Sequence, residues 1–147
     1  INEIETEDCA SINFAMTSGA LATSSITLGA AGDETRLRFV FEHLTATSGT
    51  APYATGAQPW NFEARAPQAQ EQLDAALRKT PIEPTGFEGF FTHIALDLAG
   101  DENQAVTLED GALSVAVVTA IYHSARTGCQ VALPRVSSHE LYKGWLP

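Results

Sequence analysis

Two side chains are suited by type and by position to contact a small molecule. His43 ends a predicted strand beside a loop, and a histidine there can donate, accept or transfer a proton near neutral pH. Trp60 follows the same loop, and an indole ring stacks well on the face of a sugar. We therefore predict His43 and Trp60 as substrate-binding residues. The alternatives stay open, since a histidine at a strand end is commonly only solvated and a tryptophan commonly packs in a core or an interface.

The remaining polar residues give no second site. His93, His123 and His139 are far apart in the sequence, and no two histidines have the spacing of zinc ligands. The carboxylate pairs at 101–102 and 109–110 consist of adjacent residues, which do not face each other on a helix or strand. Helix capping and solvation explain these pairs. We accordingly predict no catalytic residue and no metal ligand in this chain.

No segment has the glycine pattern that binds a dinucleotide. Such a site needs G-x-G-x-x-G at a turn from a strand into a helix, where backbone N–H groups bind the pyrophosphate. Gly29-Ala-Ala-Gly32 follows a predicted strand, but another strand and not a helix is predicted after it. We predict that this chain alone binds no cofactor.

Size and charge exclude several classes of protein. The 147 residues fit one domain, which we place at 1–147. A net charge of −10, with eight scattered lysines and arginines, argues against nucleic-acid binding. No apolar run reaches the roughly 18 residues of a membrane span, and the acidic N-terminus does not resemble a signal peptide. We expect a cytoplasmic protein without membrane or nucleic-acid partners. The two cysteines, Cys9 and Cys129, are too few for a disulfide framework.

Strands are predicted in the first half of the chain. Residues 9–16 and 20–29 alternate apolar and polar side chains around a turn at 17–19, which is typical of a hairpin. A third strand is predicted near 37–41. The small, polar, Gly- and Pro-containing residues 45–59 predict a mobile loop, and a fourth strand is predicted at 59–64.

Helices are predicted in the second half of the chain, over 68–79, 85–98 and 107–127, with a short strand at 131–133. The last helix has the clearest signals, since Thr107 and Asp110 resemble a capping box and Gly128 provides a stop. This helix is apolar nearly all round. We expect it to be buried on most sides, with a narrow polar stripe formed by Thr119, His123 and Arg126.

This order of elements favours an α+β domain. Strands followed by helices form an open-faced, mainly antiparallel sheet with its helices packed on one face. The other face would carry apolar residues that need a partner. We therefore predict a homodimer or higher homo-oligomer that forms through the sheet.

The last forty residues contain a helix start, a helix end with a glycine stop, a short strand and an aromatic-rich tail in close succession. Their sequences are Thr107-Leu-Glu-Asp-Gly111, Ala120-Ile-Tyr-His-Ser-Ala-Arg-Thr-Gly128, Val131-Ala-Leu-Pro134 and Tyr142-Lys-Gly-Trp-Leu-Pro147. This order resembles the C-terminal end of the Gfo/Idh/MocA oxidoreductases. The resemblance implies the C-terminal domain of an enzyme that uses NAD or NADP to oxidise or reduce a small sugar or polyol. The family's glycine-rich turn, Glu-Lys-Pro motif and catalytic histidine motif are not in this chain, so no catalytic residue is carried over.

Two hypotheses about function follow. The chain is either the substrate-binding and dimerisation half of such an oxidoreductase, inactive by itself, or a non-enzymatic interaction module that uses the same sheet as a dimer platform. An initial Ile1 in place of methionine, with a strand soon after it, favours the first hypothesis.

Overall fold

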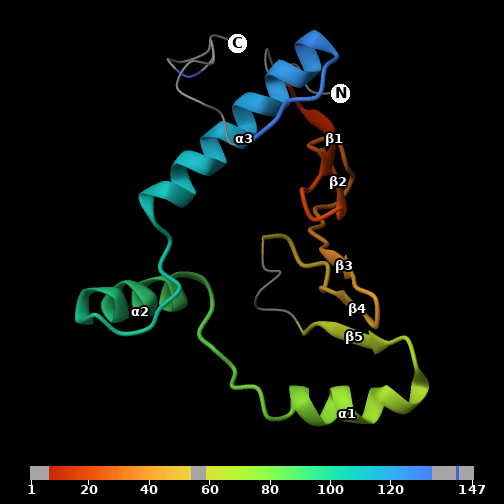
Figure 1. Cartoon of the computed structure of the whole chain (residues 1–147), viewed down its shortest axis with the longest axis vertical. Coiled ribbons are helices and arrows are strands. Elements are labelled where there is room, and N and C mark those ends of the chain that lie inside the picture. The colour runs from red at the N-terminus through yellow and green to blue at the C-terminus, as the bar shows by residue number, and fades with distance from the viewer. Residues whose placement is uncertain (1–6, 54–58, 134–141, 143–147) are drawn as a thin grey trace. The chain divides into compact units, whose positions relative to one another are not determined.

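A computed structural model describes residues 7–53, 59–133 and 142 of the chain. Over these residues the protein has an α+β fold with two antiparallel sheets and three helices, which confirms the predicted class (Figure 1). None of the described helices is both long enough and apolar enough to cross a membrane. The elements are β1 Cys9–Ala15, β2 Leu21–Thr27, β3 Arg38–Val40, β4 Leu44–Thr47, β5 Asn61–Ala64, α1 Pro67–Leu77, α2 Gly86–Ala99 and α3 Leu108–Thr127.

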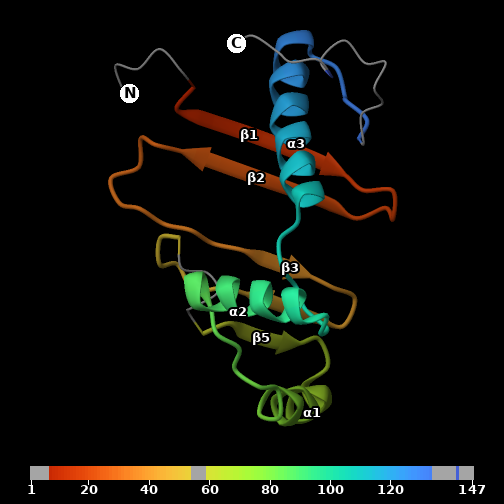
Figure 2. The same ribbon diagram turned by 90° about the vertical axis from the view of Figure 1, so that its left-hand side faces the viewer.

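The chain forms two compact units, one of residues 1–28 with 105–147 and the other of residues 29–104. In the first unit, β1 and β2 form the expected hairpin and lie side by side (Figures 1 and 2). The pairing runs in register from Cys9 opposite Thr27 to Ala15 opposite Leu21. Gly19 allows the tight turn because it adopts a φ of 88°, a value that side-chain-bearing residues rarely take.

Helix α3 of the same unit begins and ends where its sequence signals predict. The Thr107 hydroxyl accepts a hydrogen bond from the Asp110 backbone N–H at 3.2 Å, and an Asp110 carboxylate oxygen accepts from the Thr107 backbone N–H at 2.8 Å. This reciprocal pair is a capping box, here with aspartate in place of the usual glutamate. Gly128 ends the helix in the left-handed conformation, with a φ of 66°.

The prediction that α3 is buried on most sides is wrong. Leu113, Val115 and Val118 are each about half exposed or more, and only Thr119 and Ala120 of this helix are buried. Thr119 had been assigned to the exposed polar stripe. Its burial leaves no unsatisfied group, because its hydroxyl donates to the Val115 carbonyl oxygen at 2.8 Å. Burial thus follows a narrow patch of small side chains, whereas the large apolar side chains of α3 stay accessible.

The second unit contains a three-stranded sheet in the order β3-β4-β5, all antiparallel. Strand β4 overlaps the first three residues of the segment 45–59 that is predicted as a loop, so the predicted loop begins too early. Leu44-Thr-Ala-Thr47 forms a strand because β-branched threonines suit extended backbone and both flanking strands supply ladder partners. Beyond β4, the residues 54–58 of the predicted loop lie outside the described residues.

The strands therefore form two sheets and not the single sheet that the order of elements suggested. The segment between β2 and β3 has Gly29, Gly32 and the charged pair Asp33-Glu34, and it lacks apolar alternation. Next to β3, the Thr35 backbone N–H donates to the Thr50 carbonyl oxygen at 3.3 Å, which continues the β3–β4 pairing beyond the ends of the two strands. Residues 28–37 thus connect the two sheets in the sequence without forming a strand.

Helices α1 and α2 also belong to the second unit. Helix α1 runs alongside β5 (Figure 1). Helix α2 matches its predicted range within one residue and ends at Gly100, whose φ is 77°. Its Gly89 is the one buried residue of α2, and a Cβ there would collide with the Pro84 carbonyl oxygen. The predicted strand 131–133 is not a strand in the structure, and His139 lies outside the described residues.

Candidate functional site

The most distinctive surface of the molecule is one face of the β3-β4-β5 sheet. The register places Phe39 opposite Ala46 and Ala46 opposite Phe62, so these three residues form one row across the sheet. Residues two apart along a strand share a face, which adds further members to it. We call this surface the aromatic face and define it by Leu37, Phe39, Phe41, Leu44, Ala46, Ser48, Trp60, Phe62 and Ala64.

Four rings of the aromatic face form a continuous stack. The ring centroids lie 6.4 Å apart for Phe41 and Phe39, 5.9 Å for Phe39 and Trp60, and 6.3 Å for Trp60 and Phe62. The rings cover Ala46, whose exposed fraction is only 6%. Phe39 and Phe41 nevertheless keep about half of their own surface exposed. The stacked rings therefore form an apolar surface that remains accessible from one side.

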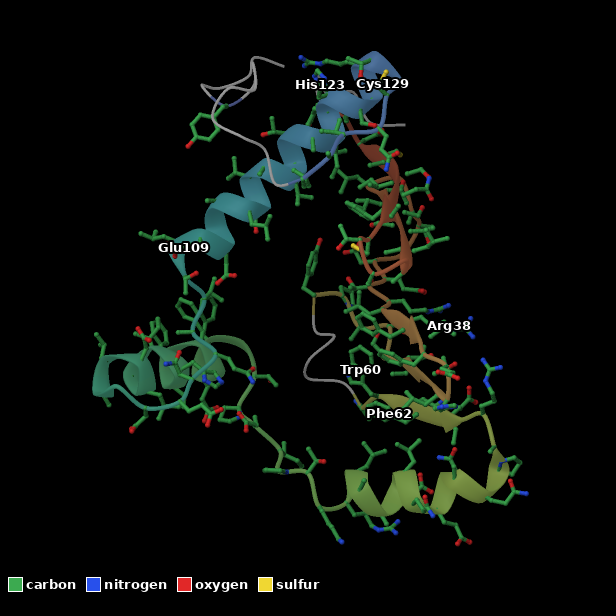
Figure 3. The ribbon with its side chains drawn as sticks, in the orientation of Figure 1. Arg38, Trp60, Phe62, Glu109, His123 and Cys129 are labelled. Carbon is green, nitrogen blue, oxygen red and sulfur yellow. The ribbon has the colours of Figure 1, made fainter. Side chains whose placement is uncertain are left out.

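The opposite face of the same sheet is polar. The strand alternation gives it Arg38, Thr45, Thr47, Asn61 and Glu63. Figure 3 shows the side chain of Arg38 extending away from the side that carries Trp60. A sheet with one aromatic and one charged face has a defined orientation, and only the aromatic face offers a broad apolar contact surface.

Trp60 lies just before β5, near the strand start predicted from the sequence, and is partly exposed. Its ring stacks between those of Phe39 and Phe62, which is the packing role considered as the alternative (Figure 3). Because the ring also keeps an accessible part, Trp60 can pack on its neighbours and still contact a ligand. Its role in substrate binding stays a prediction.

His43 lies in the turn between β3 and β4, and its side chain is 82% exposed. Its Nε2 lies 3.8 Å from a Glu42 carboxylate oxygen, and its backbone carbonyl accepts a hydrogen bond from the Arg65 backbone N–H at 2.8 Å. That backbone bond fixes the turn against the end of β5. The substrate-binding role of His43 also stays a prediction.

The structure does not bring His43 and Trp60 together. His43 lies level with Arg65, whereas Trp60 precedes the Thr47–Asn61 pair at the other end of β5. Five residues of strand separate these levels, which amounts to roughly 16 Å at about 3.3 Å per residue. One small ligand cannot contact both side chains in this arrangement. The two candidates therefore mark opposite ends of the sheet.

A half-open hollow lies at the His43 end of this sheet. It has a volume of about 300 Å³ and is lined by Phe41, Leu44, Thr45, Glu63, Ala64 and Arg65. The volume is at the lower limit for a small-molecule site. The lining combines an aromatic ring, a carboxylate and a guanidinium, a set that can hold a small polar molecule against an apolar wall. Apart from its position beside His43, nothing in the sequence pattern predicted this hollow.

The clear electrostatic perturbations lie in the other unit. The Tyr122 hydroxyl donates to a Glu7 carboxylate oxygen at 2.8 Å, which lowers the pKa of Glu7 and raises the pKa of Tyr122. Hydrogen bonds from the backbone and side chain of Thr107 lower the pKa of Asp110. The hydrogen bonds of these three groups are exposed, and they join or cap structural elements. They explain local structure and do not form a catalytic constellation.

Sequence reasoning missed the partners of Trp60. Alternation predicted that Phe39 and Phe41 share one side of their strand, but the stack with Trp60 and Phe62 depends on β4, which was predicted as loop. Tyr53 was also missed. It has a φ of 57°, unusual for a tyrosine, and its backbone N–H donates to the Thr35 hydroxyl at 3.2 Å. No sequence signal marks such a conformation in a residue other than glycine, asparagine or aspartate.

Comparison of the chain with protein-family models, with curated proteins and with solved structures gave no match. Within the described ranges, no group of three or more His, Cys, Asp or Glu side chains is arranged to hold a metal ion.

Proposed function

We propose that this chain is the C-terminal substrate-binding and oligomerisation domain of a cytoplasmic NAD(P)-dependent oxidoreductase that acts on a small sugar or polyol. The aromatic face is the observation that supports this proposal most. In it, four stacked rings present an accessible apolar floor on an otherwise polar sheet. The proposal assigns substrate contact to Trp60 at one end of this face and to His43 at the other.

Sugar rings can pack against such an aromatic surface. The C–H groups on one face of a pyranose pack against an aromatic ring, while the hydroxyl groups at its edge need polar partners. Trp60 provides the ring, and the hollow beside His43 provides a carboxylate and a guanidinium. Because roughly 16 Å separate the two ends, we propose that Trp60 and His43 contact different molecules, or different parts of an extended one.

The pattern of α3 supports the oxidoreductase part of the proposal. The capping box at Thr107 and the left-handed Gly128 give the helix the same limits as the segment that resembles Gfo/Idh/MocA enzymes. In that reading the helix is a structural support, and the bound NAD or NADP belongs to a nucleotide-binding domain elsewhere in the protein. This chain contributes no pyrophosphate-binding turn.

Oligomerisation would also use the aromatic face. Phe39 and Phe41 keep 49% and 56% of their surfaces exposed, which is costly for neighbouring aromatic side chains in water. A two-fold dimer lets one such patch cover the same patch of a second copy. Light scattering at tens of micromolar protein should then give about twice the chain mass of 15.7 kDa.

One observation favours the alternative of a non-enzymatic interaction module. The aromatic face carries no ionisable side chain among its nine residues, and Ser48 is its one polar member. The Ser48 hydroxyl accepts from the Leu37 backbone N–H at 2.9 Å and donates to the Gly49 carbonyl oxygen at 2.7 Å. A face whose polar groups are internally satisfied is better suited to packing against protein than to binding a hydroxylated ligand.

Titration calorimetry with a panel of sugars and polyols separates these functions. Ligand binding should be lost in Trp60→Ala and largely kept in Trp60→Phe, which retains an aromatic ring. Dimerisation without any ligand binding would favour the interaction module. Calorimetry should also show no micromolar binding of NADH or NADPH to this chain. A glycine-rich dinucleotide turn and a Glu-Lys-Pro motif encoded upstream of Ile1 would decide for the oxidoreductase.

A further inference from the structure

Strand β5 is an edge strand of its sheet, and the side chain of Gln70 forms hydrogen bonds with its outer side. The Arg65 backbone N–H binds the His43 carbonyl oxygen on the β4 side, so the N–H of the preceding Ala64 faces the opposite way. There it donates to the Gln70 side-chain oxygen at 2.7 Å. The Gln70 side-chain nitrogen donates to the Phe62 carbonyl oxygen at 3.1 Å. Gln70 thus binds two of the four backbone groups that Phe62 and Ala64 turn to the outer edge of the strand.

This pair of hydrogen bonds imitates a neighbouring strand. One residue of an adjacent parallel strand would offer the same two groups, an N–H to the Phe62 carbonyl oxygen and a carbonyl oxygen to the Ala64 N–H. The carboxamide offers the same two groups from α1. Its second N–H donates to an Asp74 carboxylate oxygen at 2.9 Å, one helical turn further on, which holds the amide in this orientation.

The position of α1 explains how the side chain reaches the strand. Helix α1 begins at Pro67, three residues after β5 ends, so the chain turns back along the strand at once. The helix has no side-chain N-cap. Gln70, in its first turn, is half-buried against β5, whereas Gln68 and Gln72 are exposed. Gln70 is therefore the glutamine of α1 that binds β5.

We propose that Gln70 closes the outer edge of β5 against strand addition, so that neither a second copy of the chain nor an extended peptide pairs there. Open strand edges are templates for association, and proteins protect them with charges, bulges or covering elements. Here a helix covers the edge through a single carboxamide. This inference does not depend on the proposed enzymatic role, since it concerns the edge of the sheet and not its aromatic face.

Amide hydrogen exchange tests the local part of the proposal. In Gln70→Ala and in Gln70→Met, which keeps a long flexible side chain, the Ala64 amide should exchange roughly three- to tenfold faster, the effect of one lost hydrogen bond. Gln72→Ala, on the same helix, should leave the Ala64 rate unchanged. An unchanged Ala64 rate in both Gln70 variants would overturn the assignment.

Association tests the functional part. Light scattering of the full chain should show a larger mass, or growth with time, for Gln70→Ala and Gln70→Met than for the unsubstituted chain at equal concentration. Adding Ala64→Pro should reverse this gain, because proline removes the outward N–H while the bonds to β4 are made by other residues. Association equal to that of the unsubstituted chain would overturn the proposal. So would extra association that persists with Ala64→Pro, because it would come from another surface or from unfolded chain.

Discussion

Helices α1 and α3 are held by different kinds of interaction. Helix α3 has 20 residues, a capping box at its start and a left-handed glycine at its end, and all of these lie within its own sequence. Helix α1 has 11 residues, no side-chain cap and no basic residue in its last turn. What α1 has in addition is Gln70, which binds β5. One helix is specified locally, and the other depends on a strand beside it.

The difference shows which interactions a sequence reveals. Caps act between residues three or four apart, so their pattern is visible before any fold is known. An 11-residue helix is marginal in water and needs tertiary contacts, whose partners depend on the fold. Each helix also makes side-chain hydrogen bonds to a segment outside itself: Gln70 of α1 binds β5, and Tyr122 of α3 donates to Glu7, which precedes β1. Only the Gln70 bonds are part-buried and reach backbone groups.

The largest effect should follow from Gln70→Ala. The change removes two hydrogen bonds to part-buried backbone groups of β5, so we expect the free energy of unfolding to fall by about 1–3 kcal/mol. Urea denaturation followed by circular dichroism measures this. Gln72→Ala is the control and should stay within about 0.5 kcal/mol, since Gln72 is exposed. Equal effects of the two variants would mean that α1 does not depend on its strand.

A smaller effect is expected from Thr107→Ala. Loss of the capping hydroxyl should cost about 1 kcal/mol, and the amides of the first turn of α3 should exchange faster. Thr85→Ala is a matched control, because Thr85 also precedes a helix but makes no side-chain cap hydrogen bond. Its cost should be clearly lower. If Thr85→Ala were as costly as Thr107→Ala, the capping box would not be what distinguishes α3.

The difference between local and tertiary interactions also explains how much of the fold could be predicted. The limits of α3 agreed within one residue, because Thr107, Asp110 and Gly128 carry them. Strand β4 was missed because Thr45-Ala-Thr47 is small and polar, and its strand character comes from β3 and β5 on either side. The edge contact of Gln70 has no local signal at all, since a glutamine in a helix is ordinarily solvated.

The candidate site was predictable in its parts and not in its arrangement. Alternation placed Phe39 and Phe41 on one side of a strand, and Trp60 was recognised as an aromatic residue after a loop. That these rings form one stack depends on the register through Ala46. The separation of His43 from Trp60 depends on the same register, so sequence distance alone could not exclude a shared ligand.

The capping box should also make the start of α3 sensitive to acid. The pKa of Asp110 is lowered below its ordinary 3.8, first by the Thr107 backbone N–H and then by the Thr107 hydroxyl. Its contribution to stability is therefore present above pH 3.8 and is lost as the pH falls through the lower, folded-state value. The Thr107 amide chemical shift should follow this titration. In Asp110→Asn the shift should lose that pH dependence, and a persisting transition would assign it to another carboxylate.

The smallest effect on stability should come from Tyr122→Phe, which removes a long-range hydrogen bond between α3 and Glu7. The hydrogen bond between Tyr122 and Glu7 is exposed, so water replaces the lost partner at little cost. The titration of Glu7 should still respond. Its pKa is lowered mainly by the Tyr122 hydroxyl, and should return toward the ordinary 4.5 in the variant, as the carboxyl carbon chemical shift measures. Helix α3 should keep its limits and its amide protection throughout. Loss of protection along α3 in Tyr122→Phe would show that this helix, like α1, depends on a neighbouring strand, and the contrast between the two helices would fail.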